Sequence, residues 1–376
     1  MSNRESVFRN LFLVVLYYSI ALLFLLPIFL SVEFIPPVAP IPDPNSFTGL
    51  SYRLLSVLLQ RPAAEKLMAG LQVLLFLVIF RNCILSLNPR AIYRPFLIFP
   101  FVFHLSFVSG NFNFSWGIVW WMASLLMLIK LPGSEQLKKY PGIWFFVLSM
   151  GCCLSDPLAF LLMVGMSLAW IVFQRDKSFR KKLLINWIVG LLPSLLLCFK
   201  FRIDFDFSLA TFPSIVGRLY SLLSCETIVT FEESERLFTW PVGVIITGLI
   251  IFALIKIFRP VNAEPERLLW QRILTFTALF FTLAFFVFPA TLDTESALPV
   301  KFQLVSILCI LMVIATIRLK KVWMIPLGII FLTMSVARLR QQVMTWGGSR
   351  VAAIESSYTL DDSPTIRLSD RAAARF

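Results

Sequence analysis

Long apolar segments separated by short polar ones fill most of the chain. About eleven such segments can be delimited, and most have the roughly 20 residues that an α-helix needs to cross a hydrocarbon core of about 30 Å. A transmembrane β-barrel would show short segments of alternating hydrophobicity instead. The pattern therefore predicts an all-α, polytopic integral membrane bundle of about 11 transmembrane helices.

The expected helices form one transmembrane domain, residues 1–338, followed by a polar external tail, residues 339–376. They span 11–32, 65–87, 96–109, 113–131, 141–154, 157–173, 183–200, 239–258, 270–289, 299–317 and 322–338. External loops are expected at 33–63, 201–238 and 290–298. The first loop contains leucines at helical spacing over 47–60, which predicts an amphipathic helix in the membrane interface.

One long apolar run, residues 141–174, is interrupted by Ser155-Asp156-Pro157. Proline breaks a helix or occupies its first turn. The interruption therefore predicts two helices that meet near the external face of the membrane.

The charged residues between the apolar runs predict the orientation of the chain. Segments assigned to the inside carry a net charge of +15 and segments assigned to the outside carry −2, against +13 for the whole chain. Lys and Arg are enriched in cytoplasmic loops of membrane proteins. We therefore expect a cytoplasmic N-terminus, with Arg4 and Arg9 inside, in a multi-pass membrane protein.

Composition excludes several classes of protein. Only 15% of the residues are charged and 58% are hydrophobic, whereas soluble domains have about 25% charged residues. The basic excess flanks the spans, where it meets anionic lipid, and forms no nucleic-acid-binding patch. The apolar run at 11–32 is longer than the 7–15-residue core of a signal peptide, so we expect it to be retained.

Cysteine and histidine usage gives little support to metal or redox chemistry. The cysteines are Cys83, Cys152, Cys153, Cys198, Cys225 and Cys309. They form no CxxC pair, and five of them lie in or beside apolar runs, where Cys behaves as a small hydrophobe. His104 is the only histidine. We therefore predict no metal site and assign no cofactor.

Two amides mark the turn expected between the third and fourth helices. Asn111 and Asn113 lie within Gly110-Asn111-Phe112-Asn113-Phe114-Ser115-Trp116-Gly117. Amides at membrane depth need hydrogen-bond partners, and glycines allow helices to approach closely. The segment is either a capped, tightly packed turn or a wall of an external cavity that binds a substrate.

Three acidic residues are candidate catalytic groups. Asp156 either caps the helix that follows it or serves as a functional acid near the external face. Glu33 and Asp43 belong to the proline-rich first external loop, where an acid can act as a general base or bind a cation, or can simply be solvated.

Basic residues on the external side are candidate phosphate ligands. Arg218 lies in the loop 201–238, and Lys301 lies just inside the helix expected at 299–317. Both can bind a phosphate or diphosphate through charge-assisted hydrogen bonds. Ordinary loop charge is the alternative interpretation for each.

Four short motifs, in order over roughly residues 10–340, resemble a group of bacterial polytopic membrane proteins related to the GT-C superfamily of glycosyltransferases. The motifs are Pro42-Asp43, the Gly110–Gly117 turn, Asp156-Pro157-Leu158-Ala159-Phe160 and Leu298-Pro299. The resemblance implies a multi-pass protein of the bacterial cytoplasmic (inner) membrane, with a GT-C-like fold and an external active site that uses a polyprenyl-phosphate sugar. It also implies that Asp43 is the catalytic acid of the first loop, with Glu33 as the fallback.

The chain departs from this family at several positions. Relatives often have a histidine shortly after the first-loop acid, where this chain has Ser46 and Phe47. They often have another where Asp156 stands, and an arginine near Ser296 and Ala297. These differences leave open a relative without catalytic activity.

Three hypotheses for function follow. The first is a GT-C-like glycosyltransferase that moves a sugar from a lipid-linked donor to an envelope glycan, lipid or protein on the periplasmic side. The second is a non-catalytic scaffold or assembly subunit that holds protein partners in a membrane complex. The third is a transporter. Membrane lipids are partners in each case.

Overall fold

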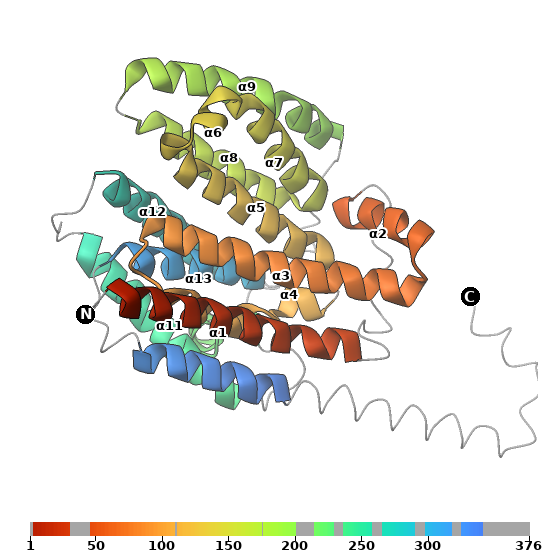
Figure 1. Cartoon of the computed structure of the whole chain (residues 1–376), viewed down its shortest axis with the longest axis vertical. Helices are drawn as coiled ribbons and strands as arrows, with labels where there is room; N and C mark the ends of the chain where they lie inside the picture. Colours follow the sequence, from red (N-terminus) through yellow and green to blue (C-terminus); the bar gives the residue numbers. More distant parts are fainter. Residues whose placement is uncertain are drawn as a thin grey trace, which may run out of the picture.

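The computed structural model describes the larger part of the chain as helices and connecting turns, with no strand among the described residues. The described residues are 3–30, 46–109, 111–174, 176–200, 214–228, 236–257, 265–289, 298–317 and 325–340. The all-α architecture predicted from the apolar pattern is confirmed for these residues. Figure 1 shows the helices along the chain.

The helices follow one another in the order that the apolar runs predict, with additional short ones. They are α1 (Asn3–Leu30), α2 (Phe47–Leu58), α3 (Arg61–Leu87), η1 (Arg94–Phe101), α4 (Leu105–Val108), α5 (Phe112–Lys130), η2 (Leu131–Gly133), α6 (Glu135–Lys139), α7 (Pro141–Ser155), α8 (Pro157–Val172), α9 (Lys177–Lys200), α10 (Ile215–Leu223), η4 (Glu226–Ile228), α11 (Arg236–Ile257), α12 (Pro265–Val287) and α13 (Leu298–Thr316). A further helical stretch covers residues 325–340.

Six helical segments of the described chain are long and apolar enough to cross a bilayer. They are Asn10–Phe29, Pro62–Leu87, Phe112–Gly133, Lys177–Cys198, Glu266–Val287 and Leu298–Thr316. Shorter apolar helices, including α7 and α8, accompany them. The chain is therefore a multi-pass helical membrane protein, and a total of eleven spans stays a prediction.

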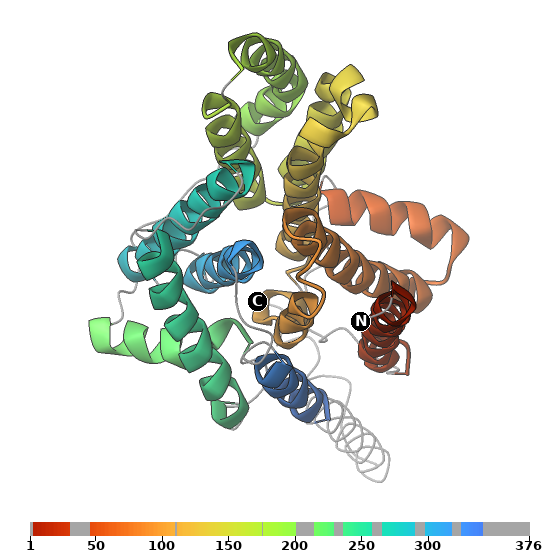
Figure 2. The ribbon, with the colours of Figure 1, turned by 60° about the vertical axis from the view of Figure 1, so that its left-hand side comes forward.

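α13 forms the centre of the bundle. Every residue from Pro299 to Thr316 is buried, and Figure 2 shows this helix surrounded by the others. By contrast, α9 and α12 expose large apolar side chains, such as Leu196 and Phe276, as expected for surfaces in contact with lipid. The polar groups of α13 are consequently enclosed by protein rather than by lipid.

Two side chains near the end of α3 cap the C-terminus of α13. Arg94 Nη1 donates to the carbonyl oxygens of Ile314 and Ala315 at 2.5 and 2.6 Å, and Asn88 Nδ2 donates to the Ala315 oxygen at 3.0 Å. The last carbonyls of a helix lack partners within the helix and carry partial negative charge. Arg94 therefore has a structural role in addition to its place in the basic loop.

The helix expected at 96–109 is not continuous. The structure has the 3₁₀-helix η1, a turn, and the four-residue helix α4 in this region, and nearly all of it is buried. Pro95 and Pro100 have no backbone N–H to donate, and a proline clashes with the carbonyl four residues earlier. The prediction of a single helix over 96–109 was therefore wrong.

The interruption at Ser155-Asp156-Pro157 is confirmed as the junction between α7 and α8. The helix expected at 47–60 is confirmed as α2, which Ser46 caps through a 3.0 Å hydrogen bond from Gly49 N. Its place in the membrane interface stays a prediction. α10, within the expected loop 201–238, was not predicted, although it is also amphipathic.

Candidate functional site

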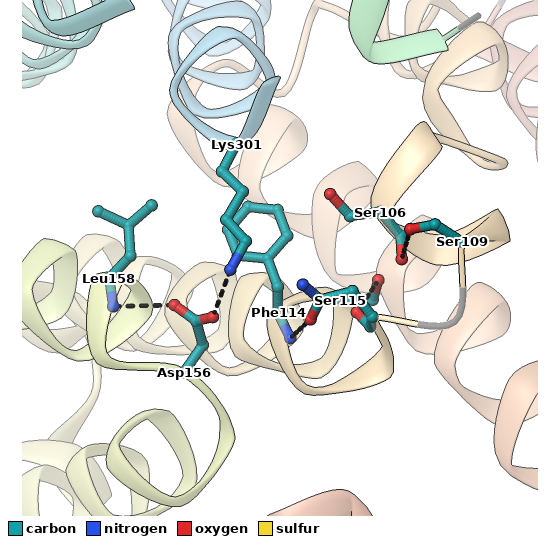
Figure 3. Close-up of polar contacts among 8 residues, drawn as sticks. Ser106, Ser109, Phe114, Ser115, Asp156, Leu158 and Lys301 are labelled. Carbon is teal, nitrogen blue, oxygen red and sulfur yellow. Dashed lines mark hydrogen bonds and ion pairs between the residues drawn. The ribbon is translucent and has the colours of Figure 1, made fainter. Parts of the chain in front are cut away.

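A buried ion pair joins α13 to the α7–α8 junction. Lys301 Nζ lies 3.1 Å from Asp156 Oδ2, and the two side chains are only 10% and 8% exposed. The same ammonium lies 4.9 Å from the centroid of the Phe114 ring, at the start of α5 (Figure 3). Three elements far apart in sequence therefore meet around one cation, through charge and a cation–π contact.

Asp156 is held in place by the local chain geometry. The residue has extended backbone angles between α7 and α8, and its Oδ1 accepts a 2.8 Å hydrogen bond from Leu158 N. Pro157 occupies the first helical position, where a proline costs no hydrogen bond. The cap uses one carboxylate oxygen and leaves the other for Lys301, so the capping interpretation holds and a functional role of the acid stays a prediction.

Gly117 brings α5 against the start of α8. A Cβ atom at this position would lie 2.8 Å from Ala159 Cβ and 3.1 Å from Asp156 Cβ, closer than side chains normally approach. Because Phe114 is three residues earlier on the same face of α5, this close packing also sets the distance between the Phe114 ring and the ion pair.

Asn111 has a capping role. Its Oδ1 accepts a 3.2 Å hydrogen bond from Phe114 N, and Ser115 Oγ donates to the Asn111 carbonyl oxygen at 3.1 Å (Figure 3). This arrangement satisfies donors in the first turn of α5. The capped-turn interpretation of the Gly110–Gly117 segment therefore holds for Asn111.

Several buried polar atoms in the first half of α5 and at the end of α7 have no hydrogen-bond partner among the described residues. These atoms are Asn113 Oδ1, Trp116 Nε1, Trp120 Nε1 and Ser155 Oγ. Trp120 packs directly on Gly151 of α7, and this contact sets the register of the antiparallel helices α5 and α7. One turn farther along each helix, Trp116 and Ser155 consequently lie at the same level. Such groups in a native protein call for a ligand, water or another part of the chain.

We call this region the outer site. It comprises Asn113, Phe114, Trp116, Ser155, Asp156 and Lys301. The charge pattern predicts that this end of the bundle lies on the external side of the membrane. The start of α2 adjoins it, because the Phe47 ring lies 5.2 Å from that of Trp116 between centroids. The described part of the first external loop therefore reaches the outer site.

Arg218 does not join the outer site through any of its contacts in the described chain. It is buried, its Nη2 donates to the Phe288 carbonyl oxygen at 2.5 Å, and its guanidinium lies 5.4 Å from the Phe285 ring centroid. Burial lowers the pKa of Arg218, while the charge of Glu226 raises it. Its contacts are those of a side chain that holds α10 against the end of α12.

Some predicted site residues lie outside the described residues. Glu33 and Asp43 are among them, as are most of the loops 201–238 and 290–298 and nearly all of the tail 339–376. Of the predicted residues that the structure describes, Asp156 and Lys301 come together, Asn113 directly precedes the Phe114 that their cation contacts, and Asn111 caps the same helix. Arg218 contributes elsewhere.

Sequence reasoning did not select Phe114, Trp116 or Ser155 as site residues. A usable signal existed, because Asn113 and Trp116 are three residues apart and share a face of one helix. Ser155 precedes Asp156 directly and was named only as part of the interruption before Pro157. The cation–π role of Phe114 depends on Lys301, which is far away in sequence, and no local pattern indicates it.

Comparisons with known proteins add no relative. No family model matches the chain, and no curated protein or solved structure is significantly similar to it. The resemblance to GT-C glycosyltransferases therefore rests on the sequence motifs alone.

Proposed function

We propose that this protein binds the phosphate group of a lipid-linked sugar at the outer site and transfers the sugar to an envelope acceptor, as a GT-C-like glycosyltransferase of the bacterial inner membrane. One observation carries the proposal: beside the buried Lys301–Asp156 pair, residues adjoining Phe114 and Asp156 in the chain hold buried polar atoms that the described protein leaves without partners. Ionisable groups within a membrane bundle are rare and commonly functional.

The polar groups of the outer site complement a sugar phosphate. An ammonium binds phosphate oxygens as a point charge, so a phosphate can replace the Asp156 carboxylate as the partner of Lys301. The Asn113 amide oxygen accepts hydrogen bonds, the Trp116 indole donates one, and the Ser155 hydroxyl does both. Sugar hydroxyl groups supply the matching donors and acceptors.

The chemical step is proposed from the family resemblance. Asp43, or Glu33 in its place, would accept the proton of an acceptor hydroxyl, or hold a cation, as the acceptor oxygen bonds to the sugar carbon and the lipid phosphate departs. Asp43 precedes Ser46 by three residues, and Ser46 begins the segment that packs on Trp116 through Phe47. This connection supports assigning the first loop to the outer site.

The binding step can be tested with purified protein and undecaprenyl phosphate as the probe, measured by native mass spectrometry. Lys301→Gln should weaken binding by about 10-fold or more, since a charge-assisted hydrogen bond is worth about 1.5–3 kcal/mol. Asp156→Asn should tighten binding, because it removes the carboxylate that competes for Lys301. Changes of opposite sign cannot both result from misfolding.

A matched control for Asp156 is available on the same chain. Asp176 also caps a helix, with its Oδ1 accepting hydrogen bonds from Ser178 N and Phe179 N, but it is exposed. Asp176→Asn should leave probe binding unchanged. Equal affinity of the wild type, Lys301→Gln and Asp156→Asn would contradict the binding proposal, and full sugar transfer by Asp43→Asn and Glu33→Gln would contradict the catalytic one.

A non-catalytic membrane subunit is the second candidate function. The observation that favours it is that Asn111, Asp156, Lys301 and Arg218 all bond to the protein itself. In addition, α2 and α10 expose apolar side chains such as Val57 and Val216, which are 81% and 76% exposed. Recovery of a stoichiometric membrane partner, with a normal phenotype for Asp43→Asn and Asp156→Asn, would support this function over the enzyme.

A further inference from the structure

α7 and α9 pack side by side in a constant register. Ser149 Oγ lies 2.7 Å from Ser194 Oγ, and Cys153 Sγ lies 2.8 Å from Cys198 Sγ. Both pairs are separated by 45 residues in the sequence. Moving four residues along α7, from Ser149 to Cys153, moves the contact four residues along α9, from Ser194 to Cys198. The two helices therefore run parallel, and each turn of α7 faces the corresponding turn of α9.

Small side chains on α9 fix the register of α7 against α9. Gly190, Ser194 and Cys198 recur every fourth residue along α9, and small residues at this spacing allow membrane helices to pack closely. A Cβ atom on Gly190 would lie 2.7 Å from Phe145 Cβ, so the helices are in tight contact one layer below the serines. The contacts of Gly190 with Phe145 and of Ser194 with Ser149 therefore align Cys198 with Cys153.

We propose that Cys153 and Cys198 form a disulfide bond that ties the outer ends of α7 and α9 together. Their sulfur atoms are 2.8 Å apart, and a disulfide requires about 2.05 Å, a difference that small side-chain rotations supply. Cys153 lies in the last turn of α7 and Cys198 lies in the last turn of α9. Both are at the end of the bundle that the charge pattern assigns to the periplasm. Disulfides form and persist in that compartment.

The reaction is an ordinary thiol–disulfide exchange. The partly exposed Cys198, as a thiolate, attacks a sulfur of a protein disulfide oxidant in the external compartment, and one oxidant thiolate leaves. The Cys153 thiolate then attacks Cys198 Sγ and displaces the second oxidant thiolate. The two cysteines are oxidised by two electrons, the oxidant becomes a dithiol, and the two protons released by the cysteines balance the two that the oxidant takes up.

The disulfide would fix the position of the outer site, although neither cysteine belongs to that site. Cys153 is three residues before Asp156, and it also contacts the Ser194 carbonyl oxygen at 3.4 Å. Linking it to α9 would hold the end of α7, and therefore the α7–α8 junction, against a second helix. This inference is independent of the proposed sugar transfer, because it depends only on the two thiols and their side of the membrane.

The test is to count free thiols in protein taken directly from cells. Cells are quenched with acid, and the denatured full-length protein is treated with N-ethylmaleimide before or after reduction and weighed by mass spectrometry. With six cysteines in the chain, we expect four adducts without reduction and six after it. Peptide mapping of the unreduced wild type should yield a linked pair of peptides containing Cys153 and Cys198.

Alanine variants assign the bond to this pair. Cys153→Ala and Cys198→Ala should each take up five adducts with or without reduction, whereas the adjacent control Cys152→Ala should keep a difference of two adducts. Six adducts in the unreduced wild type would overturn the proposal, as would a linked peptide pair that involves other cysteines. Peptide mapping needs no variant, so poor accumulation of an alanine variant leaves the proposal testable.

Discussion

Lys301 and Asp156 place opposite charges in a region where most neighbours are apolar side chains. Removing one member of such a buried pair leaves the other charge without compensation, which typically costs about 3–5 kcal/mol. Replacing both members is much less costly, because no isolated charge is then buried. The pair can therefore be strongly required by the fold even if its net contribution to stability is small.

The cost of leaving one buried charge without its partner predicts a specific pattern of thermal stabilities in detergent. Lys301→Met and Asp156→Asn should each lower the melting temperature clearly, and the double variant should recover a large part of the loss. Asparagine keeps the oxygen that accepts the Leu158 N hydrogen bond, so the Asp156→Asn effect reports the charge rather than the cap. Size-exclusion chromatography after heating gives the measurement.

The exposed cap again supplies the control. Asp176→Asn should change the melting temperature little, since partners exposed to water contribute little. If the losses from Lys301→Met and Asp156→Asn simply add in the double variant, the two side chains are not coupled, and the ion pair has no energetic role.

Asp156 and Lys301 were each selectable from the sequence, but their contact was not. Asp156 stands at a Ser-Asp-Pro interruption and Lys301 stands at the start of an apolar helix, and both signals are local. The two residues are 145 positions apart. The sequence indicated a phosphate ligand and an acid separately, and their pairing depends on how α8 and α13 pack.

At the scale of the helices, the close approach of α5 and α8 positions the ion pair relative to Phe114. Gly117 makes this approach possible, since α5 has no side chain where the start of α8 passes. Gly165 on α8 offers a comparison, because nothing lies within 4 Å of the position of its Cβ. The two glycines are both helical, and they differ in their surroundings.

Gly117→Ala should therefore destabilise the protein by about 1–3 kcal/mol, the usual cost of overpacking, and should weaken undecaprenyl phosphate binding by shifting Asn113 and Trp116 of α5 relative to Lys301. Gly165→Ala should be neutral or stabilising by up to about 1 kcal/mol, since alanine favours a helix more than glycine does. Thermal unfolding of the two variants in the same detergent compares them. Equal melting temperatures would show that α5 and α8 have room to adjust.

The difference between the single helix expected at 96–109 and the 3₁₀-helix, turn and short α-helix found there has a physical cause. Hydropathy reports that a segment avoids water, and it does so equally for an α-helix, a 3₁₀-helix and a buried turn. Two prolines, Pro95 and Pro100, were the available sign that a regular α-helix was disfavoured. α10 was missed for the converse reason, because charged residues around it led to its assignment as loop.

For the whole molecule, the two ends of α13 differ in chemistry. The end near Lys301 contacts an acid, and the other end is capped by Arg94 and Asn88, beside the basic segment expected inside. The charge pattern predicts that the end capped by Arg94 and Asn88 lies on the inside of the membrane. The outer site would then face the periplasm, as the proposed function requires.

The orientation can be tested by adding one cysteine at a time and labelling intact cells with a membrane-impermeant maleimide. Ser214→Cys, at the exposed start of α10, should gain label relative to the wild type, and Ser178→Cys, beside the basic start of α9, should gain it only after the cells are permeabilised. The reverse result would place the outer site in the cytoplasm and remove the support for periplasmic sugar transfer.

The sequence by itself determined the class of the molecule, the positions of its principal helices, the break before Pro157 and a predicted orientation. These properties follow from local hydrophobicity, proline geometry and loop charge. Only the tertiary structure decided that α13 is central, that Lys301 meets Asp156 over Phe114, and that Cys153 faces Cys198. The physical reason is that lipid and protein interior are similarly apolar, so an apolar helix carries little information about which of the two surrounds it.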